Sequence, residues 1–184
     1  MILDIGCGEE YQGDVNLDLF MYDSPHTIQC INPKYIPCFI NGDAQHLPIR
    51  DNVFNIVYSK HVIEHLDYPL DALKEMNRVS NNKIIVIVPN NPIIKEHYEH
   101  LYSWSYTSFY HILNRYMKVK KIIVTSTRKD FGKRFTTRIA NLLPFALRRK
   151  TFRWLSSIYG FELTGICQTS NTEIKEYSEL NYRG

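Results

Sequence analysis

Short apolar runs that are rich in β-branched residues recur along the chain. Several are apolar at nearly every position, whereas a half-exposed strand would alternate apolar and polar side chains. Continuous apolar runs are typical of parallel strands that are covered on both faces of a sheet. We therefore expect a buried parallel sheet with strands at residues 2–5, 15–17, 38–40, 54–58, 84–88, 119–125 and 163–167.

Two helices are predicted between these strands. The first has Asp67 as its N-cap and Pro69 in its first turn, and apolar residues at helical spacing continue to Val79. The second begins near Ser105 or Thr107. Its apolar face consists of Phe109, Ile112, Leu113 and Tyr116. Strands that alternate with helices are typical of a doubly wound α/β fold.

Composition places the chain among globular proteins. It has 184 residues, of which 44% are hydrophobic and 22% charged, and it contains no internal repeat and no linker rich in Gly and Ser. We expect one domain, residues 1–184. No apolar run approaches the roughly 20 residues that span a bilayer, and the four cysteines lack disulfide or zinc spacing. A reducing, cytoplasmic setting is therefore expected.

The net charge of +3 hides a strong asymmetry. Residues 115–153 contain thirteen Lys or Arg and one acidic residue, Asp130, so this stretch carries +12 and the rest of the chain −9. Much of this positive charge falls in a predicted insertion, residues 126–160, where basic and apolar residues interleave. This pattern fits a lid over an acceptor, a helix on an anionic membrane, or a surface that contacts nucleic-acid phosphates. We favour the lid, because no motif of RNA-binding proteins is present.

A glycine pair follows the first strand at once. Gly6-Cys7-Gly8 permits a tight turn through which backbone N–H groups approach a ligand. The next strand ends in Asp18, a carboxylate that could accept hydrogen bonds from both hydroxyls of a ribose. A dinucleotide site is disfavoured, because its third glycine would fall at Tyr11 and Asp18 comes too early. A nucleoside ligand without a diphosphate fits better.

Taken together, the motifs resemble those of class I S-adenosylmethionine-dependent methyltransferases, in the small-molecule branch with a generic methyltransferase domain. The resemblance covers about residues 1–125. It is carried by Leu3-Asp4-Ile5-Gly6-Cys7-Gly8, Asp18, Gly42-Asp43-Ala44-Gln45-His46-Leu47-Pro48, Asp51-Asn52-Val53-Phe54-Asn55-Ile56-Val57, His61-Val62-Ile63-Glu64-His65-Leu66 and Pro89-Asn90.

This resemblance implies a Rossmann-like sheet of seven strands, mostly parallel with an antiparallel last strand, and S-adenosylmethionine as cofactor. Asp4 would orient the cofactor's amino group, and Asp18 would hold its ribose. The implied cofactor-binding residues are Asp4, Gly6, Cys7, Gly8, Asp18, Leu19, Asp43, Ala44, Ser59 and Lys60. The residues expected to bind the acceptor are His65, Asn90, His100 and Trp104.

The chain also departs from the family pattern. The third glycine of the motif is missing, and the chain has Glu9-Glu10 instead. Asp18 follows Gly8 by only ten residues, so the first crossover helix is expected to be shortened or absent. Nothing precedes the first strand, where relatives carry a covering helix. We therefore expect an open or low-affinity cofactor site in a minimal or truncated chain.

His61 is the candidate catalytic residue, because it follows the fourth strand near the expected position of the methyl group. It could take a proton from an acceptor hydroxyl, since histidine titrates near neutrality, or it could pack beside the cofactor. The same stretch matches H-x-x-E-H, in which two histidines one helical turn apart bind zinc in metallopeptidases. Relatives carry a similar His-Val-Leu-Glu-His-Leu run here, so we expect no metal.

Beyond the fifth strand, Pro89-Asn90-Asn91-Pro92 is expected to form a rigid polar loop. Imidazoles and aromatic rings follow and would line an acceptor pocket; they are His97, His100, Tyr102, Trp104 and Tyr106. In the alternative, Trp104 and Tyr106 cover the edge of the sheet.

The expected function is methyl transfer to a small molecule or to a glycan-linked or lipid-linked acceptor. Two alternatives remain. The enzyme could act on RNA through residues 115–153, or the chain could be a non-enzymatic partner protein with a degenerate cofactor site. Peripheral contact of residues 115–153 with an anionic membrane also stays open.

Overall fold

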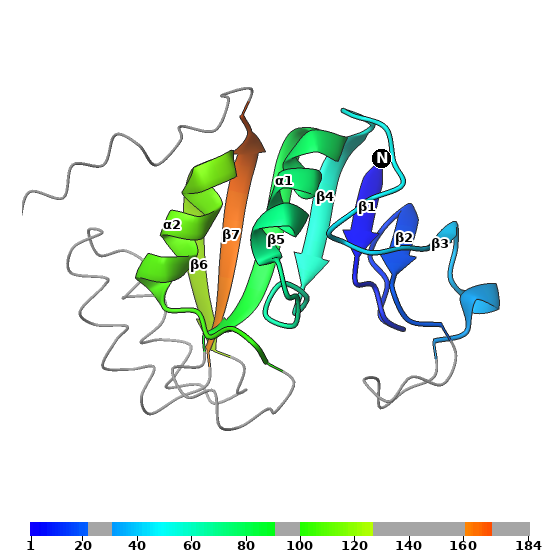
Figure 1. Ribbon diagram of the computed structural model, residues 1–184, viewed down its shortest axis with the longest axis horizontal. Coiled ribbons are helices and arrows are strands. Elements are labelled where there is room, and N and C mark those ends of the chain that lie inside the picture. The colour runs from blue at the N-terminus through cyan, green and yellow to red at the C-terminus, as the bar shows by residue number, and fades with distance from the viewer. Residues whose placement is uncertain (22–30, 91–99, 127–160, 171–184) are drawn as a thin grey trace, which may run out of the picture.

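Seven strands form one mixed sheet in the computed structural model, which describes residues 1–21, 31–90, 100–126 and 161–170 (Figure 1). The strands are β1 (Ile2–Ile5), β2 (Val15–Asp18), β3 (Phe39–Asn41), β4 (Phe54–Lys60), β5 (Ser80–Asn90), β6 (Met117–Ser126) and β7 (Phe161–Thr169). Their order across the sheet is β3-β2-β1-β4-β5-β7-β6. Strands β1 to β5 pair in parallel, and β7 runs antiparallel to β5 and β6. The predicted Rossmann-like sheet with a reversed last strand is confirmed.

Most strands extend further than their apolar runs, and two of these extensions bear on the candidate site. β4 continues through Lys60, and β5 continues through Asn90 because its ladder with β7 pairs Pro89 with Glu162. The prediction of a loop over residues 89–92 was therefore wrong for Pro89 and Asn90, and residues 91 and 92 lie outside the described residues. Tertiary pairing with a distant strand keeps Pro89 and Asn90 extended.

The described residues form two α-helices, α1 (Pro69–Val79) and α2 (Tyr106–Tyr116), and a 3-10 helix, η1 (Pro33–Tyr35), which precedes β3. The N-cap of α1 is Tyr68, which makes no side-chain cap, so the prediction of Asp67 was wrong by one residue. Proline suits the first helical position, and this places the cap directly before Pro69. α2 starts after Ser105, one of the two predicted starts, in a capping box with Ser108.

Both helices lie in front of the sheet in the view of Figure 1. Their buried faces meet the central strands in one continuous core. It includes Leu73 and Met76 of α1, Phe109 and Leu113 of α2, and Val57, Ile84, Val86 and Leu163 of the strands. This packing holds the strand ends, which carry the candidate site, in fixed positions.

Only part of the basic stretch falls on described residues. Lys118, Lys120 and Lys121 are exposed on β6, at the edge of the sheet. The predicted insertion, residues 126–160, lies outside the described residues from position 127 onward. Within the described ranges, neither helix has the length and apolar character needed to cross a membrane.

Candidate functional site

A turn after β1 occupies the place where a helix would cover the sheet. The described residues 6–14 contain no helix, which confirms the expectation for the first crossover. Gly6 and Gly8 have φ angles of +70° and +52°, and the Gly6 N–H donates to the Leu17 carbonyl over 2.8 Å. A Cβ on Gly6 would lie 2.1 Å from Cγ2 of Val62. Glycine therefore lets the segment after β4 pack directly on this turn.

Asp18 closes the turn from the end of β2. Its Oδ2 accepts the Gly8 N–H at 3.0 Å, and its Oδ1 accepts the Phe20 N–H at 3.0 Å. The side chain is buried. Each carboxylate oxygen has a further lone pair, so both can still accept a hydroxyl. The Gly42 N–H donates to the Asp18 carbonyl over 3.0 Å, which brings the end of β3 to the same place.

Asp4 is a buried carboxyl one residue before the end of β1, with 2% of its surface exposed. Burial raises its pKa to about 6, and the charge of Asp18 adds to this effect. The Gln12 N–H, which donates to its Oδ2 at 2.7 Å, opposes the rise. A carboxylate that is costly to ionise would gain from a nearby cation. Burial also raises the pKa of the Cys7 thiol to about 12, which keeps that side chain neutral.

The loop after β3 carries Asp43 and Ala44 as predicted. The Asp43 Oδ1 accepts the Gln45 N–H at 2.8 Å, and Ala44 is buried. Arg78 of α1 holds the following segment, because its Nη1 donates to the Ile49 carbonyl at 2.7 Å. This helix therefore fixes a loop that carries two of the predicted cofactor-binding residues.

The end of β4 lies beside the glycine turn. Ser59 pairs in register with Ile5, and the residue is 1% exposed. Its Oγ has no hydrogen-bond partner among the described residues. A buried hydroxyl without a partner is costly, so a ligand at this edge would be stabilised by its hydrogen bond. Lys60 is exposed, and so is Leu19 beyond β2.

His61 follows β4 with a φ angle of +56°. Its Nδ1 lies 3.2 Å from Glu64 Oε1, and its Nε2 lies 2.9 Å from Glu162 Oε1. Burial lowers its pKa, but the hydrogen bonds to Glu162 and Glu64 outweigh burial and raise it to about 9. The pKa of Glu162 is lowered by the same contact. The imidazole is thus held as a cation between two carboxylates.

Glu162 was missed by sequence reasoning. It lies on β7, 101 positions after His61. No motif links the two residues, so only the antiparallel placement of β7 beside β5 could reveal the contact.

The predicted acceptor residues fall into two groups. His65 and His100 lie together, with ring centroids 4.7 Å apart. Asn90 is buried at the end of β5, and Trp104 is 5% exposed within the main core, stacked on Tyr102. This packing favours the role of Trp104 as a cover of the sheet. His97 lies outside the described residues.

Comparison with known sequences matches the first half of the chain. Residues 3–87 match the model of the family described as "Methyltransferase domain". An uncharacterised protein of Methanocaldococcus jannaschii is 44% identical over 60 residues, which are 31% of this chain and 26% of that protein. Demethylmenaquinone methyltransferase of Chlamydia trachomatis is 36% identical over 52 residues, which are 28% of this chain and 23% of that protein. The matched stretch thus spans about a quarter of these curated relatives.

Solved structures match most of the chain. One is a chain in the complex between the Haloferax volcanii Trm112 methyltransferase activator and a methyltransferase, with TM-score 0.61 and 16% identity. The match covers 94% of this chain and 82% of that one. Geranyl diphosphate C-methyltransferase from Streptomyces coelicolor, solved with Mg²⁺, geranyl diphosphate and S-adenosyl-L-homocysteine, has TM-score 0.58 and 11% identity, and the match covers 92% and 73%. At such identities the likeness is one of fold.

Proposed function

We propose that this chain, which carries a class I methyltransferase domain, binds S-adenosylmethionine and transfers its methyl group to an acceptor. One observation carries the proposal: two buried carboxylates, Asp4 and Asp18, flank a glycine turn at the ends of adjacent parallel strands. Ligands of open α/β sheets bind at this edge. S-adenosylmethionine has a ribose diol and an ammonium group, which suit two carboxylates.

Asp18 is the residue proposed to hold the ribose. Its oxygens are oriented by the N–H groups of Gly8 and Phe20, each at 3.0 Å, so the carboxylate is fixed before any ligand arrives. Pre-oriented acceptors bind a diol without the entropic cost of ordering a side chain. Leu19, the next residue, is exposed and would cover the ribose from outside.

Asp4 is proposed to orient the ammonium group of the methionine part. Its raised pKa indicates that the ionised carboxyl lacks sufficient compensation within the protein. A cation beside it would restore the charged form. The Oγ of Ser59, which has no partner among the described residues, would bind the same end of the ligand. Backbone groups of Gly6, Cys7, Gly8 and Lys60 complete this part of the proposed site.

Asp43 and Ala44 are proposed to bind adenine. The carboxylate of Asp43 would accept from the amino group, and the Ala44 N–H would donate to the ring. Arg78 stabilises the next segment of this loop through the carbonyls of Leu47 and Ile49.

When bound, the cofactor supplies a methyl group on a positively charged sulfur. The protein must align the acceptor with the carbon–sulfur bond and, for a hydroxyl, find a place for its proton. His61 lies beside the proposed methionine end, and its contacts with Glu64 and Glu162 hold the imidazole in one orientation. As a base, the imidazole would first have to release one of its two ring protons, whereas the packing role needs no such step.

For the acceptor we propose a small molecule, or a glycan-linked or lipid-linked group. Support comes from the names of two similar proteins, which state small acceptors, demethylmenaquinone and geranyl diphosphate. RNA is the second candidate, because Lys118, Lys120 and Lys121 are exposed on the edge strand β6. RNA binding that weakens steeply with salt would favour this second candidate.

Calorimetry with S-adenosyl-L-homocysteine tests the proposal. We expect one binding site per chain, and we expect Asp18→Asn to weaken binding by about 10- to 100-fold, because hydrogen bonds to a charged group are lost. Asp71→Asn, an exposed aspartate of α1, is the matched control and should bind as the wild type does. Absence of binding to the wild type in the micromolar range would refute the proposal. Equal binding by Asp18→Asn would refute the assigned ribose site.

A further inference from the structure

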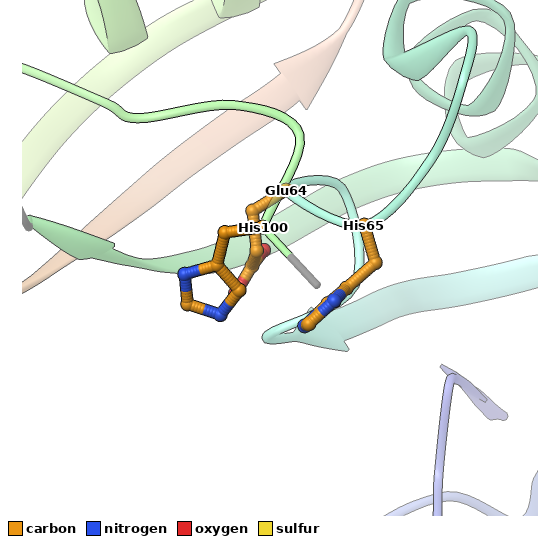
Figure 2. A group of neighbouring side chains, drawn as sticks. All are labelled: Glu64, His65 and His100. Atoms are coloured by element: carbon orange, nitrogen blue, oxygen red, sulfur yellow. The ribbon is translucent and has the colours of Figure 1, made fainter. Parts of the chain in front are cut away.

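Three ligand-type side chains gather beside the loop that follows β4, two of them from that loop and one from the segment before α2. One side-chain atom each of Glu64, His65 and His100 lies within 4.8 Å of the others (Figure 2). Figure 2 shows all three side chains projecting to the same side of the loop. Two backbone bonds bring the distant histidine here: the N–H groups of Leu101 and Tyr102 donate to the Glu64 carbonyl at 2.8 and 3.2 Å.

The carboxylate of Glu64 supplies the second observation. Its side chain is fully buried, and its Oε1 contacts His61 Nδ1 at 3.2 Å. Its Oε2 is buried and has no hydrogen-bond partner among the described residues. Leaving such an oxygen unsatisfied is unfavourable unless a donor or a cation binds it. The free oxygen belongs to the residue that lies next to two imidazoles.

We propose that Glu64, His65 and His100 form a site for a divalent first-row transition-metal ion. Imidazole nitrogens suit Zn²⁺, Co²⁺, Fe²⁺ and Ni²⁺, whereas Mg²⁺ and Ca²⁺ prefer oxygen ligands throughout. Bonds of about 2.0–2.2 Å place neighbouring ligand atoms about 3–3.5 Å apart. Ligand atoms 4.8 Å apart must therefore close by about 1.3–1.8 Å. His65 is exposed and its ring lies edge-on to that of His100, so the movement amounts to a reorientation of two rings that are already in contact.

This ligand set differs from the one in the H-x-x-E-H motif. That motif needs a helix, in which the first and last histidines share a face. Residues 61–65 form a turn, and both nitrogens of His61 contact carboxylates. His100, 35 positions after His65, takes the place of the first histidine.

The location suggests that the metal would bind the acceptor, an inference that rests on the proposed methyl transfer. The same loop packs on the glycine turn, where Val62 approaches Gly6. Three protein ligands leave coordination positions open, as in catalytic metal sites. Those positions would take water or an oxygen atom of the acceptor, which favours an acceptor with a hydroxyl or carboxylate group.

The test is a Co²⁺ titration of the untagged, metal-stripped full chain, followed by visible absorption and calorimetry. We expect one Co²⁺ per chain, displacement by Zn²⁺, and no competition from millimolar Mg²⁺. His65→Ala and His100→Ala should each weaken Co²⁺ binding at least tenfold. His111→Ala, an exposed histidine of α2, is the matched control and should bind Co²⁺ as the wild type does.

Three outcomes would overturn the metal site: no stoichiometric Co²⁺ binding, equal binding by both ligand variants, or an equal loss in His111→Ala. His65 is exposed, so its variant keeps the test valid even where His100→Ala unfolds. S-adenosyl-L-homocysteine binding is measured on the same samples. If the chain binds S-adenosyl-L-homocysteine but not Co²⁺, only the metal site is overturned. If it binds Co²⁺ but not S-adenosyl-L-homocysteine, the metal site is supported and the proposed function is overturned.

Discussion

Asp4 offers the sharpest test of the candidate site, because its negative charge has opposite effects with and without ligand. In the ligand-free protein the charge is destabilising, whereas in the proposed complex it binds the cofactor's ammonium group. Asp4→Asn keeps the size of the side chain, and the amide oxygen can accept the Gln12 N–H that Asp4 Oδ2 accepts at 2.7 Å. The charge is removed. We expect the variant to be more stable than the wild type at neutral pH and to bind S-adenosyl-L-homocysteine more weakly.

The expected gain in stability follows from the pKa of Asp4, which burial raises from 3.8 to about 6. The unfolded chain releases this proton near pH 4, whereas the folded chain keeps it until about pH 6. The wild type therefore loses stability as pH rises between these values, at about 1.4 kcal/mol for each pH unit. At pH 7.5 the wild type has lost about 3 kcal/mol of its free energy of unfolding. Asp4→Asn avoids this loss, so its Tm should be about 6–12 °C above that of the wild type.

Urea unfolding of both proteins at pH 4.5 and 7.5 measures this difference. We expect the two free energies of unfolding to lie within about 1 kcal/mol at pH 4.5 and to separate in favour of Asp4→Asn at pH 7.5. Asp71→Asn is the control, since an exposed substitution usually changes stability by less than about 0.5 kcal/mol. A difference that does not change with pH, or a less stable Asp4→Asn at pH 7.5, would refute the reasoning.

Two further predictions concern the glycine turn and His61. Gly6→Ala should cost at least about 2 kcal/mol of stability, because the new Cβ would lie 2.1 Å from Val62 Cγ2, whereas Gly8→Ala, with nothing within 4 Å of its Cβ, should cost about 1 kcal/mol. Urea unfolding measures both, and equal costs would contradict the close packing of Val62. His61→Ala should lower turnover far more than affinity for S-adenosyl-L-homocysteine, as measured by initial rates and calorimetry. An equal loss of both would make His61 a binding or packing residue.

The strands could be predicted well because their signal is local. Continuous apolar runs located all seven, and the spacing of Gly8 and Asp18 indicated the missing crossover helix. The start of α2 at Ser105 also followed from a local capping preference. The end of β5 could not be predicted from a local signal, because Pro89 and Asn90 remain extended through pairing with β7.

The candidate site divides in the same way. Asp4, Gly6, Gly8 and Asp18 stand within one short stretch, so their motif was visible, and the Gly8 N–H donates to Asp18 Oδ2. The residues that contact the loop after β4 come from distant parts of the sequence. Glu162 reaches His61 from β7, and the chain near His100 is bonded to the Glu64 carbonyl.

The sequence by itself therefore determined the sheet, its glycine turn and the pair of aspartates, because each depends on residues close together in the chain. Only the tertiary structure decided which side chains meet beyond β4. There, pairing of β7 with β5 and docking of residues 101–102 on Glu64 bring together groups that are many residues apart. Burial then set their electrostatics: it raised the pKa of Asp4 and left Glu64 Oε2 without a partner among the described residues.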